Sequence, residues 1–277
     1  MSSRDFAGKS VFITGAGSGI GYEIALAFAR EGADVLATDV SQEGPTKLCP
    51  EVESHGVEYR SEILNVADEQ AFQQLAEKLA VQESLPDIVV NNAGIAYLDT
   101  FANTSSELWH RIFDVNVMGV VHGSRLFINY WQQANKAGHL VNIASGASVT
   151  PVPNMAAYAA SKYAVEGLCD VIAMELAGSN IQVSCVHPGV INTAIVQHND
   201  QMAMPAEQVE RLQRHYIEKG AHPSVVAKAI LKGVKKNKGN IFVGPGTTLP
   251  PLMKRLLPRS LFRAILRSEA RKIGYLY

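Results

Sequence analysis

Short runs of apolar residues alternate along the chain with stretches in which apolar positions recur every three or four residues. The apolar runs predict strands buried on both faces, over residues 11–13, 35–38, 88–90, 140–143, 181–186 and 241–243. The amphipathic stretches predict helices over residues 22–30, 69–80, 105–135 and 158–176. Residues 41–50 are polar and rich in turn formers, and they follow neither pattern.

The same pattern predicts a single domain. No Gly/Ser-rich or Pro-rich linker divides the chain, and no internal repeat is visible. Short, uniformly apolar strands separated by helices are typical of a parallel sheet covered on both faces. We therefore expect one α/β domain with a doubly wound parallel sheet over residues 1–250, followed by an extension over residues 251–277.

The composition is that of an ordinary globular protein. Of the 277 residues, 47% are hydrophobic and 18% are charged, and the three cysteines lack the spacing of a metal site. Few, unpaired cysteines are typical of a reducing compartment. Without a secretory signal or an unbroken run of about 18 apolar residues, the expectation is a soluble cytoplasmic protein with no bound metal.

The net charge of −1 conceals a strong asymmetry along the chain. Residues 219–277 contain 13 of the 25 lysines and arginines but a single acid, Glu269. A basic C-terminal region next to an acidic body predicts contact with an anionic surface or ligand. The alternative is that these cations are solvated on the last helices.

The first predicted strand runs directly into a glycine-rich turn that is followed by a helix. The turn has the pattern T-G-x-x-x-G-x-G from Thr14, whereas the common G-x-G-x-x-G spacing fails because Ile20 occupies its last position. Such a turn lets backbone amides and a helix N-terminus approach a pyrophosphate. The alternative is a glycine-rich turn without a ligand. The residues assigned to cofactor binding here are Gly15, Ser18, Gly19 and Ile20.

Asp39 ends the second predicted strand. A carboxylate at this point can accept hydrogen bonds from both hydroxyls of an adenosine ribose, and it would repel the 2′-phosphate of NADP. Ser18, Val40 and Ser41 supply no cation that would offset this repulsion. We therefore expect NAD in preference to NADP. The alternative is an exposed turn aspartate.

Five short motifs occur in a fixed order along the chain. They are Thr14-Gly15-x-x-x-Gly19-x-Gly21, Asn91-Asn92-Ala93-Gly94, Ser145, Tyr158-x-x-x-Lys162 and Pro188-Gly189-x-x-x-Thr193. A single Y-x-x-x-K often arises by chance, but five motifs in register do not. Over about residues 7–245 the chain resembles the short-chain dehydrogenase/reductase family. The resemblance implies a Rossmann-like fold and an NAD(P)-dependent oxidoreductase.

Tyr158 and Lys162 are four residues apart in a predicted helix, so their side chains share one face. A phenol with a pKa near 10 is a poor base at neutral pH, and lowering this pKa by about three units requires roughly 4 kcal/mol. An ammonium group at about 4 Å supplies that order of magnitude, and the charge of oxidised nicotinamide would add to it. We therefore expect Tyr158 to be the general acid or base, and Ser145 to hold the substrate oxygen in line.

The resemblance assigns roles to further residues. It implies that Lys162 also binds the nicotinamide ribose, and that Asn116 supports a water chain carrying the proton to solvent. Asparagine is a poor helix former, so Asn116 in mid-helix is consistent with a local kink, and a surface asparagine is the alternative. Asn65 and Val66 are expected beside the adenine, although many relatives carry Asp in place of Asn65. The remaining cofactor contacts that it implies are Asn92, Ala93, Gly94, Tyr158, Pro188, Gly189, Ile191 and Thr193.

The segments expected to line a substrate pocket are apolar, over residues 95–98, 149–155 and 195–196. Residues 194–216 are expected to form a mobile lid that contains Met202 and Met204. Flexible methionines suit irregular apolar ligands, although they also serve in ordinary packing. These segments favour a lipophilic secondary alcohol or ketone, which could be steroid-like, cyclic or long-chain.

Three other functions are compatible with parts of this pattern. A sugar-nucleotide epimerase or dehydratase would carry T-G-x-x-G-x-x-G, which requires glycine where the chain has Ser18, and a larger C-terminal substrate domain. A 3-oxoacyl thioester reductase belongs to the same family. A catalytically idle NAD-binding regulator would be expected to lack Tyr158 or Lys162, and both are present.

Two expectations concern partners. Small residues along the Tyr158 helix, and the usual pairing of this helix in the family, predict a homodimer or homotetramer. No nucleic-acid partner is expected. The extension forms a basic amphipathic pattern, broken at Pro258, that could lie against an anionic membrane. The alternative is that its apolar stripe packs on the body or on a partner subunit. The apolar positions are Leu252, Leu256, Leu257, Leu261, Phe262, Ile265, Leu266 and Ile273.

Overall fold

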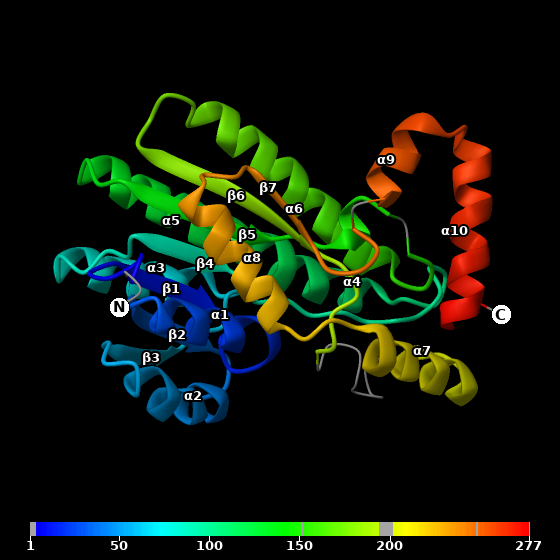
Figure 1. Ribbon diagram of the computed structural model, residues 1–277, viewed down its shortest axis with the longest axis horizontal. Helices are drawn as coiled ribbons and strands as arrows, with labels where there is room; N and C mark the ends of the chain where they lie inside the picture. Colours follow the sequence, from blue (N-terminus) through cyan, green and yellow to red (C-terminus); the bar gives the residue numbers. More distant parts are fainter. Residues whose placement is uncertain (1–3, 151, 194–201, 248, 277) are drawn as a thin grey trace.

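Seven parallel strands form one sheet with helices on both faces, shown in Figure 1. The computed structural model describes residues 4–150, 152–193, 202–247 and 249–276. The strands lie in the order β3-β2-β1-β4-β5-β6-β7. Because the chain leaves β1 toward one edge and returns to start β4 on its other side, the expected doubly wound sheet is confirmed. The strands are β1 (Ser10–Thr14), β2 (Asp34–Asp39), β3 (Tyr59–Ile63), β4 (Ile88–Asn91), β5 (Gly138–Ile143), β6 (Ile181–Pro188) and β7 (Asn240–Val243).

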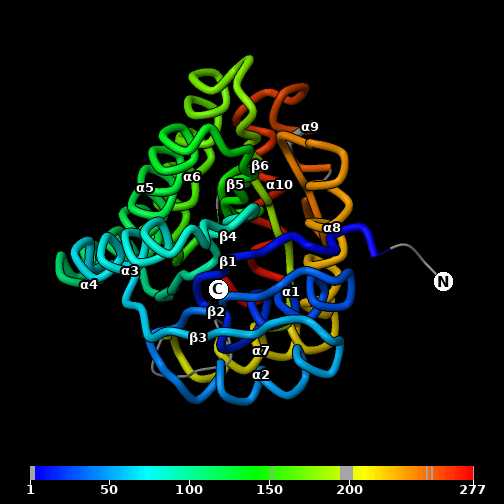
Figure 2. The backbone as a smooth tube through the Cα atoms, turned by 90° about the vertical axis from the view of Figure 1, so that its left-hand side faces the viewer, coloured from blue at the N-terminus to red at the C-terminus, as the bar shows by residue number. Residues whose placement is uncertain are grey.

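The helices pack in two layers, one on each face of the sheet. Figure 2 shows α3, α5 and α6 on one side of the strands and α1 and α8 on the other. The helices are α1 (Gly19–Arg30), α2 (Glu43–Glu53), α3 (Glu69–Val81), α4 (Ser106–Phe113), α5 (Gly119–Gln133), α6 (Ala156–Glu175), α7 (Ala206–Lys219), α8 (Ser224–Lys235), α9 (Leu249–Leu256) and α10 (Arg259–Ile273), with short η1 (Asp114–Met118) and η2 (Gly146–Ser148) segments.

The central strands alternate their side chains between two apolar cores. In β1, Val11 and Ile13 join the core under α1 and α8, whereas Phe12 joins the core under α3 and α5. All three side chains are fully buried. Burial on both faces explains why these strands are uniformly apolar.

Four elements were not predicted from the pattern: α2, β3, α7 and α8, of which α7 occupies much of the segment expected to be a mobile lid. Residues 41–50 belong largely to helix α2, which has a polar surface and buries Pro45, Leu48 and Val52. Strand β3 lies at the edge of the sheet and pairs only with β2, so none of its residues is fully buried and its sequence Tyr-Arg-Ser-Glu-Ile carries no apolar run.

The helix predicted over residues 105–135 is interrupted. The structure has α4, then a π-helical turn over Asp114–Met118, then α5. The expected kink at Asn116 therefore exists, and π-helical turns inside α-helices often occur at functional sites.

The C-terminal extension forms α9 and α10, which are separated at Pro258 as expected. Figure 1 shows α7 and α10 at the same end of the molecule, and the two helices are in contact. Among the described residues, no helix combines the length and apolar character needed to cross a bilayer.

Candidate active site

A cavity of about 1220 Å³ opens at the carboxyl ends of the parallel strands. Residues at or just after the ends of β1, β2, β4, β5 and β6 line it, which is where ligands bind in doubly wound sheets. All of the predicted site residues line this cavity except Asn116. These lining residues are Gly15, Ser18, Gly19, Ile20, Asp39, Asn65, Val66, Asn92, Ala93, Gly94, Ser145, Tyr158, Lys162, Pro188, Gly189, Ile191 and Thr193.

The turn after β1 needs glycine at several positions, either for its backbone conformation or for lack of space. Gly15 and Gly19 have φ values of 64° and 54°, a region that favours glycine. A Cβ atom on Gly21 would lie 2.1 Å from the Gly15 carbonyl oxygen, so a side chain there would displace the backbone. Ser18 is the N-cap residue of α1 and lines the cavity together with Ile20. This glycine cradle at a helix N-terminus fits the pyrophosphate of a nicotinamide dinucleotide.

Asn92 holds the glycine turn in place from the neighbouring strand. Its side-chain amide donates to the carbonyl oxygens of Thr14 and Gly15, at 3.0 Å each. The Thr14 hydroxyl in turn accepts hydrogen bonds from the backbone amides of Asn92 and Ala93. Asn92 therefore organises the turn through its side chain in addition to lining the cavity.

Asp39 is half-buried at the end of β2, so it is not an exposed turn residue. One carboxylate oxygen accepts from the backbone amide of Gly17 at 2.9 Å, and the other accepts from Ser41 at 3.2 Å. The carboxylate thus fastens the glycine turn to β2 and also lines the cavity. Sequence reasoning identified Asp39 for ribose binding but missed the contact with Gly17.

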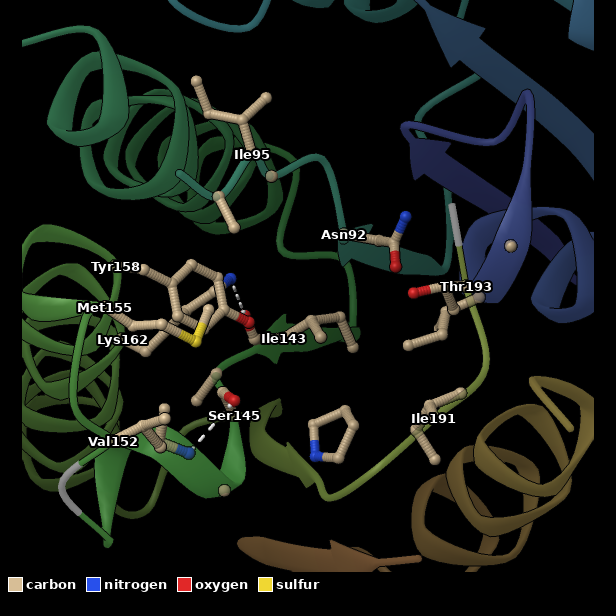
Figure 3. Close-up of a pocket in the computed structure, with 18 of the residues that line it drawn as sticks. Asn92, Ile95, Ile143, Ser145, Val152, Met155, Tyr158, Lys162, Ile191 and Thr193 are labelled. Carbon is tan, nitrogen blue, oxygen red and sulfur yellow. Dashed lines mark hydrogen bonds between the residues drawn. The ribbon is translucent and has the colours of Figure 1, made fainter. Parts of the chain in front are cut away.

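Tyr158, Lys162 and Ser145 lie together on one side of the cavity, opposite Thr193 and Ile191 (Figure 3). Tyr158 and Lys162 are in the first turns of α6, and Ser145 follows β5. The Lys162 ammonium donates to the Ile143 carbonyl oxygen at 2.8 Å and lies 5.8 Å from the centre of the Tyr158 ring. This bond connects α6 to the end of β5.

Burial disfavours the charged forms of Tyr158 and Lys162 and shifts both pKa values accordingly. It raises the pKa of Tyr158 to about 12, although the Ser145 hydroxyl acts in the opposite direction. It lowers the pKa of Lys162 to about 8. The expectation that Lys162 lowers the pKa of Tyr158 is therefore wrong for the protein alone, because the ammonium is bonded to a backbone carbonyl and desolvation of the phenol dominates.

Asn116 lies behind the cavity and is fully buried, so it is not a surface residue. Its side chain accepts from the Ile95 amide at 2.8 Å and donates to the Ile95 carbonyl at 2.9 Å. It also donates to the Ser161 hydroxyl at 3.0 Å. Asn116 thus ties the segment after β4 to helix α6. Its role in a water chain stays a prediction.

The adenine and nicotinamide ends of the expected cofactor site are shaped largely by backbone. Asn65 uses its side-chain oxygen to accept from the Ala67 amide at 3.2 Å. Pro188 ends β6, and a Cβ on Gly189 would lie 1.9 Å from the Pro245 carbonyl oxygen. Thr193 lies against Gly19, since a Cβ there would be 3.4 Å from the Thr193 methyl group.

The walls of the cavity include residues that sequence reasoning did not assign. Segment 149–155 contributes as expected, whereas Ile195 and Val196, and the first part of the predicted lid, lie outside the described residues. Tyr216 on α7 and four residues of the extension complete the wall. The only sequence signal for the extension residues was the amphipathic pattern. These four are Leu266, Glu269, Ile273 and Tyr275.

Comparisons with known proteins agree with this geometry. A family model described as "short chain dehydrogenase" matches residues 9–203. A protein of Mycobacterium tuberculosis named "Probable oxidoreductase EphD" is 36% identical over 273 residues, which are 96% of this chain and 45% of that protein. The chain therefore spans about half the length of this relative. A "Cyclopentanol dehydrogenase" of Comamonas testosteroni is 35% identical over 225 residues, covering 80% of this chain and 88% of that enzyme.

The fold agrees equally well with a solved structure. A short-chain dehydrogenase/reductase from Burkholderia phymatum, crystallised in complex with NAD, superposes with a TM-score of 0.81 at 27% identity. The match covers 97% of this chain and 96% of the other. On its motifs, its fold and these matches, the chain belongs to the short-chain dehydrogenase/reductase family of oxidoreductases.

Proposed function

We propose that the protein is an NAD-preferring oxidoreductase that interconverts a lipophilic secondary alcohol and its ketone. The observation that carries this proposal is the position of Tyr158. It lines the cavity beside Ser145 and packs against an apolar cluster that extends from Ala96 and Leu98 to Ile273 in the extension. An acid/base residue bordered by such a surface suits a substrate whose reacting oxygen is attached to a largely apolar body.

Tyr158 handles the proton in this reaction. Because burial raises its pKa to about 12, the phenol is protonated at neutral pH and can donate its proton to a ketone oxygen. In the oxidative direction the same oxygen takes the proton of the alcohol. Ser145 lies beside Tyr158 and holds the substrate oxygen, while Lys162 keeps α6 in register with β5.

The glycine turn, Asp39 and the segment 188–193 would hold the nicotinamide dinucleotide. When bound, this cofactor supplies or accepts the hydride, and in its oxidised form it adds a positive charge that favours the tyrosinate. The half-buried carboxylate of Asp39 supports NAD over NADP, because a 2′-phosphate beside it would be repelled. The Comamonas relative is named for a cyclic secondary alcohol, which supports the same substrate class for this chain.

The proposal is tested by NADH absorbance with purified protein, NAD and a panel containing cyclopentanol, 2-decanol and a hydroxysteroid. A 3-oxoacyl thioester with NADH or NADPH is included as the competing substrate. We expect turnover of at least one alcohol. Turnover of the thioester alone would replace the proposal, and NAD binding with no turnover of any compound would indicate a regulator.

Tyr158→Phe identifies the proton donor. This variant keeps the aromatic ring but lacks the hydroxyl, so turnover should fall by at least a thousandfold while NAD binding, measured by calorimetry, is retained. Tyr130→Phe on α5 is the matched control and should be as active as the wild type, since Tyr130 does not line the cavity. Near-normal activity of Tyr158→Phe would mean that another group transfers the proton.

A further inference from the structure

The end of the extension is fastened across the substrate side of the cavity. Helix α10 ends at Gly274, whose φ of 109° turns the chain inward. The following residue, Tyr275, is buried, and its carbonyl oxygen accepts from the side-chain amide of Asn154 at 2.8 Å. A Cβ on Gly274 would lie 3.1 Å from the Gln208 carbonyl oxygen, so the turn packs closely on α7. The extension is therefore part of the pocket wall.

Two tyrosine hydroxyls meet inside this wall. The hydroxyl groups of Tyr216 on α7 and Tyr275 are 2.7 Å apart, and both residues line the same cavity as Tyr158. Both rings belong to the apolar cluster that includes Leu98, Met155 and Ile273. The pair is thus a polar group at the edge of an apolar cluster.

All three phenols are neutral at physiological pH. Burial raises the pKa of Tyr216, and it raises the pKa of Tyr275 further with help from the neighbouring Tyr216 and Tyr158. As neutral phenols, the two residues of the pair carry two O–H protons between them.

One of these protons has no acceptor among the residues that the structure describes. When one hydroxyl donates to the other, the second proton is unused by any hydrogen bond among the described residues. A buried donor without an acceptor is costly, and buried hydroxyls are nearly always hydrogen-bonded. The cavity is the space in which an acceptor can lie, because both residues line it.

We propose that Tyr216 and Tyr275 form a second polar subsite, which binds a hydroxyl or carbonyl oxygen of the substrate remote from the carbon that is oxidised. This inference rests on the proposed alcohol/ketone activity. It narrows the substrate class to lipophilic molecules that carry two oxygens, of which one reacts at Tyr158 and the other is held by the tyrosine pair.

The test compares secondary alcohols with and without a second oxygen. The probes are 2-hexanol, 2-octanol and 2-decanol, each beside the diol that adds a hydroxyl on the far terminal carbon. The methyl ketone product is quantified, so that oxidation of the terminal hydroxyl is not counted. At the chain length that spans the two sites, wild-type kcat/KM should be about tenfold higher for the diol.

Tyr216→Phe and Tyr275→Phe are made separately, and either should reduce this preference to near unity. Tyr130→Phe, remote from the cavity, should keep the wild-type ratio. Thermal unfolding verifies that each variant is folded. A purely structural role for the pair would lower kcat/KM for alcohol and diol in the same proportion, and would leave the ratio unchanged.

Two results would overturn the inference, and they differ. If the wild type oxidises the simple alcohols but shows no preference for a diol at any length, or if both variants keep the preference, the subsite is wrong and the proposed function stands. If the wild type forms no methyl ketone from any of the alcohols and oxidises no other alcohol, the proposed function itself fails and the subsite with it.

Discussion

At the scale of single residues, burial shifts the pKa values of Tyr158 and Lys162 in opposite directions. Both shifts favour the neutral form, and both arise from the same desolvated corner between α6 and β5. The protein without cofactor therefore holds the tyrosine as a proton donor. With a pKa of about 8, Lys162 begins to lose its proton just above neutral pH.

Lys162→Met should reveal this shift as a pH-dependent stability. The pKa of Lys162 is about 8 in the folded protein, against an ordinary value of 10.5, so between these pH values the unfolded chain binds a proton that the folded chain does not. Stability must then rise with pH across this window. The unfolding free energy of the wild type relative to the variant should increase by about 3 kcal/mol from pH 8 to pH 10.5. Urea unfolding without cofactor measures it.

The exposed residue Lys232 on α8 provides the control for this measurement. Lys232→Met removes an ammonium group from the surface, so its stability difference from the wild type should stay constant over the same pH range. A constant difference for Lys162→Met as well would mean that Lys162 is not desolvated in solution.

Asp39→Asn should relax the choice of cofactor. The amide oxygen of asparagine can still accept from Gly17, whereas the negative charge that would repel a 2′-phosphate is lost. We expect kcat/KM with NADP to rise relative to NAD by about tenfold. Asp34→Asn is the control, since Asp34 lies at the other end of β2 and accepts from the Glu58 amide. A wild type that prefers NADP would contradict the argument.

At the scale of elements, the sequence predicted those helices, strands and turns whose conformation depends on a short stretch of neighbouring residues. The glycine turn, the Tyr158 helix and the uniformly apolar strands each follow from a short pattern that the backbone or the sheet requires. Strand β3 was missed because an edge position needs no apolar run, and α2 was missed because its surface is polar. The pKa of Tyr158 was predicted in the wrong direction because desolvation depends on the whole fold.

Helix α9 and the start of α10 present leucines to solvent. Leu249, Leu252, Leu256 and Leu261 are between 49% and 72% exposed, whereas Phe262, Ala270 and Tyr275 of the same extension are buried against the body. Packing on the body therefore accounts for α10. Helix α9 contacts the body through Lys254, which donates to the Tyr163 hydroxyl on α6 at 3.0 Å, but its leucines stay exposed. The neighbouring cations Lys254, Arg255 and Arg259 form no ion pair within the described chain. We propose that this apolar, basic surface contacts anionic lipid.

Co-sedimentation with phosphatidylglycerol vesicles tests this contact. Each cation near the lipid contributes roughly 1 kcal/mol, so the full chain should sediment at low salt and be released at high salt. The double change Leu252→Ser with Leu256→Ser should reduce binding severalfold, whereas Val81→Ser, at an exposed valine on α3, should not. Protein that stays in solution at low salt would favour contact of α9 with another protein surface.

At the scale of the whole molecule, α6 carries an apolar stripe on its outer face. Val171 and Met174 are 48% and 69% exposed, and nothing lies within 4 Å of a Cβ added at Gly167. An exposed stripe of this kind on a catalytic helix supports the homodimer or homotetramer that the family resemblance implies.

We expect light scattering to give a mass of at least twice the 29.9 kDa of one chain. Met174→Arg would place a charge in the proposed interface and should shift the protein toward the monomer at micromolar concentration. Val81→Arg introduces the same charge at an exposed position on α3 and should leave the mass unchanged. A monomeric wild type would contradict the proposal.

The contribution of Tyr275 to the pocket could not be predicted, because its contacts with Tyr216 and Asn154 join segments that are far apart in sequence. The periodicity of the extension indicated a helix with an apolar side but not the surface on which it packs. The residues proposed to recognise the substrate therefore come from the part of the chain with the weakest motifs, whereas those proposed to hold the cofactor come from the strongest.

The cavity is lined from the ends of five strands of one sheet. A single molecule that filled it would touch residues from both halves of the sheet, so unfolding of either half would release it. Binding therefore adds to the free energy of unfolding by mass action, about 2.7 kcal/mol at a ligand concentration one hundred times Kd. A shift in melting temperature can thus rank NAD against NADP, and one diol against another, before any turnover has been detected.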